Sequence, residues 1–295
     1  MSGFMSSSTA MTIFDGIGSK FSSDSLRANG FTTDLDADGK RSGWVGLGDP
    51  LDLNFEFGLD QAGYAGFSLR IDSRSASSAA VAFQLAESIK EKQAAGQKVS
   101  GQAKKDLKEA ITAKLLSQAP FIPSLVDCIW DLENGRLFVS STSDKTLQTV
   151  IANFQKTFGV SPNLLEVKRD MKEIFAEICH NEQFECGDYV LSPYGSASLA
   201  TTAQDEDQSQ VAVQNSLPAV ASALDEGMKI KKLRIVASCE KEPDLLIDFA
   251  LDDSLAVSGL KLPKAEKGSE ADAEFLLKTD ICSKVASIVE NLASA

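Results

Sequence analysis

The sequence is poor in the side chains that most often carry catalysis or cross-link a fold. It has one histidine in 295 residues, and its five cysteines are scattered and odd in number. Such cysteines fit reduced thiols rather than a disulfide framework. No apolar run approaches the roughly 18 to 20 residues of a membrane span, and the opening "MSGFMSSSTAMTIF" lacks the basic and apolar regions of a secretory signal. We therefore expect a cytoplasmic protein without a membrane partner.

Positive charge is also scarce. The chain has 29 Lys and Arg against 42 Asp and Glu, a net charge of -13. Affinity for a nucleic acid comes largely from cations that release counterions from phosphates, so this sum argues against such a partner. A protein that surrounds a duplex, however, needs only a basic inner face, so the distribution of charge decides more than its total.

Strand and helix patterns occur without a regular alternation. The segment up to about residue 75 is rich in Gly, Ser and Asp and has strand candidates at Leu51 to Phe57 and Tyr64 to Ile71. Two helical patterns follow, at about residues 79–117, and they predict a helix pair that projects from a sheet. Their apolar residues recur every fourth position, which gives each helix one buried stripe: Val81, Leu85 and Ile89, then Leu107, Ile111 and Leu115.

The stretch "CIWDLENGRLFVSS" predicts a β-hairpin. Asn134-Gly135 between strand formers is typical of a two-residue turn in which both residues take positive φ. Trp130 lies in the first strand beside Ile129 and Leu132, which favours a place in the core. The helical pattern "SDKTLQTVIANFQKTF" follows at once.

The C-terminal part begins with an amphipathic helical pattern. A polar stretch at about residues 192–218 then predicts an exposed connection. Three consecutive strand patterns that predict an antiparallel meander and a final amphipathic helix complete the chain. Runs of strands mixed with helices indicate an α+β fold with antiparallel sheets and packed helices. We place an N-terminal region at 1–167 and a C-terminal region at 168–295.

The helix pair concentrates positive charge. The segment from Glu87 to Lys114 contains seven lysines and four acidic residues, a local net charge of +3 in a chain of -13. Lysines serve as point charges for phosphates without reading bases, which suits binding that ignores sequence. From the residues alone, a solvated helix face with pairs such as Lys105 and Glu109 is the favoured alternative. The candidate DNA contacts are Lys90, Lys92, Lys98, Lys104, Lys105, Lys108 and Lys114.

Phe121 lies between Pro120 and Pro123 in a stiff loop. Its ring would either contact DNA or a second subunit, or fold back into the core. The residues alone leave these alternatives open.

Two segments resemble metal sites in part. "DLDADGK" places Asp34, Asp36, Asp38 and Gly39 as in the first half of a calcium loop, but Val45 stands where a bidentate Glu is needed, so a polar turn is favoured. We predict no metal cofactor, and weak calcium binding stays open.

His180 lies between Cys179 and Cys186. Two thiols and one imidazole do not complete a four-ligand zinc site, and Cys179, as the chain neighbour of His180, points elsewhere on a helix. A structural or surface role is favoured.

A metal-dependent exonuclease is the competing enzymatic class. It would need carboxylates gathered around ions about 4 Å apart. Asp248, Asp252 and Asp253 come nearest, but acids at strand turns are common for structural reasons. We predict no enzyme activity.

The order of several motifs resembles the RdgC family of bacterial recombination-associated proteins. The motifs are "GWV" at Gly43 to Val45, "KKDLKEAITAKLL", "WDLENGRLFV", "SDKTLQTVIANFQKTFG", "DDSLAVSGLKL" and "SKVASIVENL". The resemblance implies an arc-shaped α+β subunit that closes as a dimeric ring around duplex DNA in the nucleoid. It also implies inhibition of recombinase filaments without catalysis, and it favours DNA contact by the lysines.

One departure supports an alternative. Val211 and Ala212 stand where family members usually carry a basic pair. A divergent acidic member that binds a protein partner or mimics DNA is therefore the second hypothesis.

Overall fold

The computed structural model describes residues 3–36, 39–200, 211–214, 217–264 and 270–294. Its residues form two compact units. Unit 1 comprises Met1–Gly30, Trp44–Leu69 and Leu125–Ala295, and unit 2 comprises Phe31–Gly43 and Arg70–Ser124. The division follows contacts in space, and the boundary at residue 167 stays a prediction.

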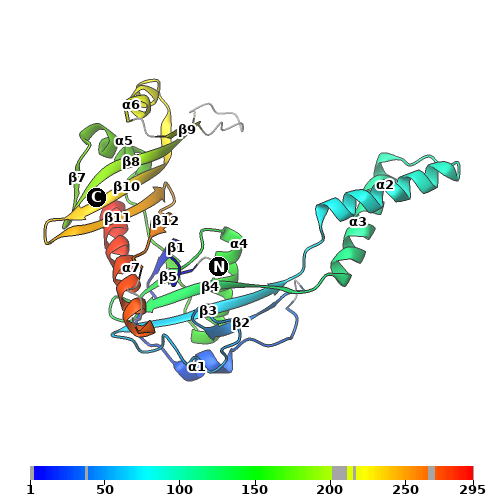
Figure 1. Cartoon of the computed structure of the whole chain (residues 1–295), viewed down its shortest axis with the longest axis horizontal. Coiled ribbons are helices and arrows are strands. Elements are labelled where there is room, and N and C mark those ends of the chain that lie inside the picture. The colour runs from blue at the N-terminus through cyan, green and yellow to red at the C-terminus, as the bar shows by residue number, and fades with distance from the viewer. Residues whose placement is uncertain (1–2, 37–38, 201–210, 215–216, 265–269, 295) are drawn as a thin grey trace. The chain divides into compact units, whose positions relative to one another are not determined.

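The described residues form seven α-helices and twelve strands, and the described strand pairings within unit 1 are antiparallel, so the fold is α+β as expected (Figure 1). The helices are α1 (Ser23–Ala28), α2 (Ser78–Ala94), α3 (Gly101–Gln118), α4 (Asp144–Phe158), α5 (Met171–Asn181), α6 (Leu217–Asp225) and α7 (Ala271–Ser294). The strands are β1 (Ser8–Asp15), β2 (Arg41–Gly46), β3 (Tyr64–Ser73), β4 (Ile122–Asp131), β5 (Arg136–Val139), β6 (Asn163–Leu164), β7 (Phe184–Cys186), β8 (Tyr189–Ala200), β9 (Val211–Gln214), β10 (Lys229–Cys239), β11 (Glu242–Asp252) and β12 (Val257–Lys261).

Strand β1 joins the two halves of the sheet. It pairs with β5 through Ile13 and Phe138 and with β12 through Thr9 and Leu260. From β12 the sheet continues through β11, β10, β8 and β7, and on the other side through β5, β4, β3 and β2. The strands predicted as a meander, β10 to β12, are confirmed.

Buried aromatic and aliphatic side chains form the core of unit 1. Helix α7 contributes Phe275, Val285 and Val289, and β11 contributes Phe249. Trp130 is 1% exposed, and its indole Nε1 donates to the carbonyl oxygen of Gly18 at 2.9 Å. Its ring packs on Phe154 and Phe158 of α4 and on Phe21, so the predicted core position is confirmed.

The hairpin of β4 and β5 has a longer turn than predicted. Asp131 pairs with Arg136, which leaves four residues in the turn, and only Gly135 of the Asn-Gly pair has positive φ, at 65°. The Asp131 carboxylate accepts bonds from the backbone N–H groups of Glu133 and Asn134 and from the Asn134 side chain. These bonds stabilise the wider turn, as Asp side chains commonly do.

The predicted strand at 51–57 was wrong. Asp52 organises these residues into turns, because its carboxylate accepts from the backbone N–H groups of Asn54, Phe55 and Glu56 at 2.8 to 2.9 Å. The predicted strand at 64–71 is confirmed as β3.

The predicted polar connection at 192–218 was wrong for its first part. Strand β8 extends to Ala200 and pairs with β10 and, near its end, with β9, where Leu199 faces Val211. Its inward side chains include Leu191, Ala197 and Leu199, which are buried. Residues 201–210 of the connection lie outside the described residues.

Among the helices of the described residues, none combines the length and apolar character that crossing a membrane requires.

Candidate nucleic-acid interface

Helices α2 and α3 form the predicted helix pair of unit 2. Each begins at a serine cap: the Ser77 hydroxyl accepts from the N–H of Ala80, and the Ser100 hydroxyl accepts from that of Ala103. Capping satisfies N–H groups that lack helical partners. The predicted stripes meet as a small core with Val81, Leu85 and Ile111 buried and Ile89, Leu107 and Leu115 packed against them.

The seven candidate lysines project from this pair into solvent. Six are exposed and Lys92 is half-buried. Lys90 and Lys92 belong to α2, Lys98 to the connection, and Lys104, Lys105, Lys108 and Lys114 to α3. Within the part of the chain that the structure describes, none makes an ion pair, and the expected support between Lys105 and Glu109 is not formed. The charge of these ammonium groups therefore remains available to a partner.

One exposed aromatic side chain accompanies the lysines. Phe83 on α2 is 65% exposed. It falls off the stripe of Val81, Leu85 and Ile89, and this break in the periodicity was a signal that the sequence analysis did not use.

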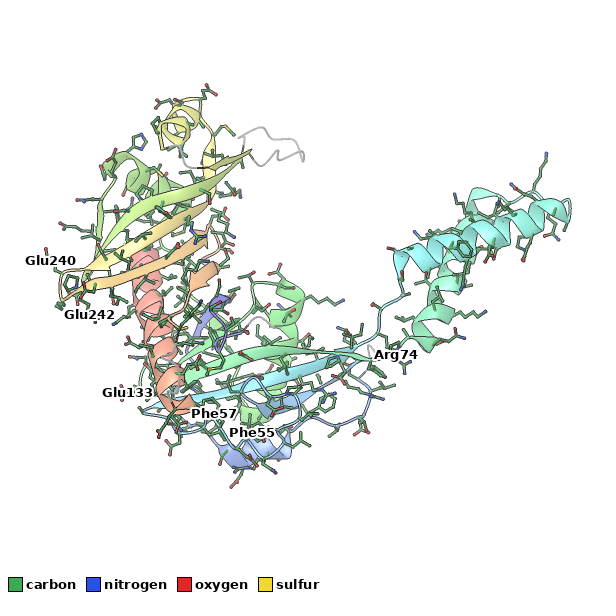
Figure 2. The ribbon with its side chains drawn as sticks, viewed as in Figure 1. Phe55, Phe57, Arg74, Glu133, Glu240 and Glu242 are labelled. Carbon is green, nitrogen blue, oxygen red and sulfur yellow. The ribbon has the colours of Figure 1, made fainter. Side chains whose placement is uncertain are left out.

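Phe121 neither projects as a bare tip nor enters the apolar core. The Cζ atoms of Arg41 and Arg74 lie 3.9 and 4.1 Å from the centre of its ring. Figure 2 shows Arg74 where β3 ends and the chain turns toward α2. Arg74 also donates from Nη1 to the carbonyl oxygen of Ser117 at 3.3 Å. Neither arginine was a predicted site residue, because they come from segments distant in sequence.

In a second arginine–phenylalanine contact of the same unit, the arginine is paired with a carboxylate. Arg70 lies over Phe31 with Cζ 4.0 Å from the ring centre, and it donates two bonds of 2.8 Å to Asp72. The fork of Arg70 matches the two oxygens of Asp72, the favoured geometry for this pair.

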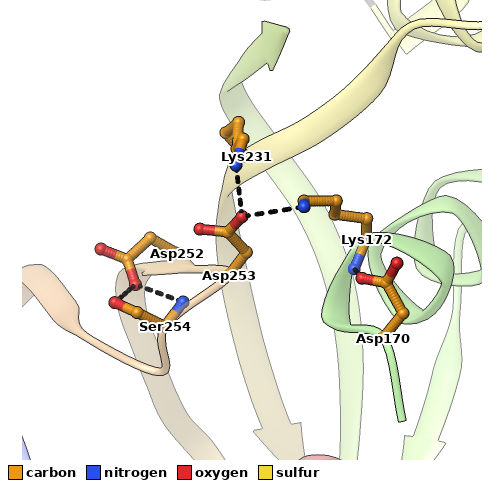
Figure 3. A network of polar contacts seen from close by, with 6 residues as sticks. All are labelled: Asp170, Lys172, Lys231, Asp252, Asp253 and Ser254. Carbon is orange, nitrogen blue, oxygen red and sulfur yellow. Dashed lines mark hydrogen bonds and ion pairs between the residues drawn. The ribbon is translucent and has the colours of Figure 1, made fainter. Parts of the chain in front are cut away.

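Two of the carboxylates considered for a nuclease, Asp252 and Asp253, have structural partners in unit 1 (Figure 3). Asp253 pairs with Lys231 at 2.9 Å and with Lys172 at 3.4 Å. Asp252 closes the turn after β11, because its Oδ1 accepts from the hydroxyl and backbone N–H of Ser254 and from the N–H of Ala256.

Asp248 is likewise occupied, since Arg234 donates to it at 2.7 Å. The described residues contain no group of three His, Cys, Asp or Glu side chains placed to hold a metal ion.

His180 and the two nearby cysteines do not form a site. The His180 ring is exposed and its Nδ1 lies 2.7 Å from the carbonyl oxygen of Ala176. Cys179 and Cys186 are buried, and burial raises the pKa of each thiol to about 11, so both stay protonated at neutral pH.

The segment that resembles a calcium loop forms a turn. The Asp36 carboxylate accepts from the N–H of Lys40 at 2.8 Å, and Asp34 accepts from the hydroxyl of Thr32 at 3.2 Å. Asp38 lies outside the described residues, so calcium binding stays open.

Strand β10 carries a run of cations that the sequence analysis passed over as a strand pattern. Lys231 and Arg234 are paired with acids, whereas Lys229 and Lys232 form no ion pair with described residues. The sequence "KIKKLR" was the available signal.

A comparison with models of protein families identifies the family of this chain. A model described as "Putative exonuclease, RdgC" matches residues 20–282. The chain belongs to the RdgC family. The predicted resemblance is thus confirmed over most of the chain. A search of curated proteins gave no match. Membership in the RdgC family fits a recombination-associated role with DNA binding, and the description of the family also names an exonuclease.

Proposed function

We propose that this RdgC family member binds duplex DNA without sequence preference and does not cleave it. The observation that carries the proposal is the set of seven lysines on α2, α3 and their connection, which have no ion-pair partner in the described structure. The lysines and arginines that form ion pairs elsewhere in the described structure already have acidic partners within the same chain. Flexible ammonium groups without partners suit phosphate contacts at many registers.

The test is duplex binding at increasing salt. The logarithm of affinity should fall linearly with the logarithm of salt concentration, and each lost phosphate contact should flatten the slope by about 0.9. Substituting Lys104, Lys105 and Lys108 with Ala together should therefore flatten it by about two to three. A slope near zero for the wild type, or an unchanged slope in the variant, would favour the protein-partner alternative.

The protein further acts as a symmetric dimer that closes around the duplex in the nucleoid and restrains recombinase filaments. Family membership supports this part, and two-fold association is the commonest closed symmetry. Light scattering at micromolar concentration should give twice the mass of the chain, 31.5 kDa per copy. A monomer under these conditions would contradict the ring.

The exonuclease alternative rests on the description of the family. Linear and nicked duplexes incubated with magnesium or manganese should stay intact. The control is a variant with Asp248, Asp252 and Asp253 all changed to Asn. Degradation by the wild type that disappears in this variant would support catalysis, although the structural partners of these acids argue against it.

A further inference from the structure

The loop between α3 and β4 holds two arginines on one aromatic ring. The Cζ atoms of Arg41 and Arg74 lie 3.9 and 4.1 Å from the centre of the Phe121 ring, so they are at most about 8 Å apart. Two guanidinium groups stacked parallel to the ring at these distances would overlap on one face, so we infer that the ring lies between them, and cation–π attraction holds both groups in place.

The sandwich has no anionic partner among the described residues, where neither Arg41 nor Arg74 makes an ion pair. Two like charges within this distance repel, which opposes the attraction of the two cation–π contacts. A bound anion would turn the unfavourable pair into a favourable triad.

The hydrogen-bonding capacity of the two groups is also largely unused. Each guanidinium has five N–H donors, and among the described residues the only hydrogen bond from the pair is that of Arg74 Nη1 to the Ser117 carbonyl oxygen at 3.3 Å. Both Nε atoms are buried without an acceptor in the described structure. Buried donors without acceptors are costly, but an external phosphate does not reach these two atoms, so any contact with it falls to the other N–H groups of the two side chains.

The contact of Arg70 with Phe31 shows what a completed site looks like in the same unit. There the guanidinium lies at a similar distance over its ring, but Asp72 accepts two bonds from it. Arg41 and Arg74 contact the Phe121 ring in the same way, but neither has a carboxylate partner among the described residues.

We propose that Arg41 and Arg74, held on the two faces of Phe121, bind a phosphodiester group of the DNA backbone. Guanidinium forks match phosphate oxygens, and the two forks can contact one group at the edge of the ring that separates them. Because both faces of Phe121 are covered, a base cannot stack on it, so the contact is to the backbone. The inference rests on the proposed function and adds a fixed anchor to the flexible lysines.

The experiment measures binding of a fluorescein-labelled 30-base-pair duplex by anisotropy at several salt concentrations. The test variant combines R41Q with R74Q, and each substitution is also made alone. The matched control combines K145Q with K156Q, which removes two exposed charges from α4 in unit 1. Thermal unfolding verifies that every variant folds.

The double variant should flatten the salt slope by about one to two and each single variant by about one, while the control keeps the wild-type slope. An unchanged slope in the arginine variants would overturn the inference and leave a purely structural sandwich, even if the lysine variant still flattens the slope. Equal flattening in the control would overturn it too, as a general charge effect. Absence of binding by the wild type is the separate result that removes the proposed function.

Discussion

The two units handle charge in opposite ways. Unit 2 holds eleven of the Lys and Arg and eight of the Asp and Glu, a net charge of +3, whereas the rest of the chain sums to -16. Among the described residues, nine cations of unit 1 form ion pairs, while in unit 2 only Arg70 does. The acidic total therefore conceals a unit with a net positive charge, in which most cations form no ion pair with described residues.

The units also differ in how much apolar surface holds them. The core of unit 1 includes large rings such as Phe175, Phe249 and Trp130, whereas the helix pair of unit 2 buries only Val81, Leu85 and Ile111 among its cluster. A small core supports local opening at low free energy. Unit 1 thus has the features of a scaffold, and the helix pair those of a contact element.

The largest expected effect is in the core of unit 1. Trp130→Ala should lower the free energy of unfolding by about 3 to 5 kcal/mol, because it leaves a cavity beside Phe154 and Phe158 and an unpaired Gly18 carbonyl. Urea unfolding followed by circular dichroism measures it. A loss below 1 kcal/mol would contradict the central place of this ring.

A smaller and local effect is expected in the helix pair. Ile111→Ala should cost about 2 to 3 kcal/mol, since it removes one of three buried side chains between α2 and α3. Hydrogen exchange should speed up across 78–118 while β10 and β11 keep their protection. Uniform loss of protection in both units would show that they unfold together.

Local sequence patterns predicted the helix pair, whereas features that depend on residues distant in sequence were not predicted. The stripe residues were recognisable because apolar residues spaced by four lie on one face of a helix in successive turns. The sandwich of Arg41, Phe121 and Arg74 was not, since its members meet only after β2, β3 and β4 form. Strand β8 escaped recognition because small inward residues such as Ala197 give weak alternation.

The lysines, by contrast, were predicted from the local excess of positive charge, although the residues alone favoured a solvated helix face and only the family resemblance favoured DNA contact. Sequence spacing suggested that Lys105 and Glu109 pair, but whether a long exposed side chain does so depends on rotamers that spacing does not fix. The structure shows that the seven lysines form no ion pairs within the described part of the chain.

Cations of the two units should also differ in their effect on stability. Arg234→Met should cost about 1 to 3 kcal/mol, because it leaves the Asp248 carboxylate, whose Oδ1 is already buried without a partner, without its ion pair. Lys108→Met, the matched change in unit 2, should stay within about 0.5 kcal/mol. Equal losses of stability in thermal unfolding would contradict the distinction between cations that form ion pairs and cations that do not.

The smallest effect concerns a buried acid of unit 1. Asp127 is 4% exposed, and burial raises the pKa of its carboxyl above 3.8, although bonds from the Ser68 hydroxyl and the Phe4 N–H lower it in part. Between 3.8 and the raised pKa, the folded protein holds a proton that the unfolded chain has lost. Stability contributed by this group is therefore present below pH 3.8 and is lost as pH rises through the folded pKa.

Asp127→Asn removes this titration and keeps a side-chain oxygen that can accept one of the two bonds. The unfolding free energy of the wild type minus that of the variant should therefore decline as pH rises from about 3.8, and it should become constant above the folded pKa. Urea titrations from pH 3.5 to 7 measure this difference, in which the other carboxylates of unit 1 cancel. A difference that increases with pH would mean that the two hydrogen bonds to the ionised carboxylate outweigh its burial, and that Asp127 belongs with the paired charges of unit 1.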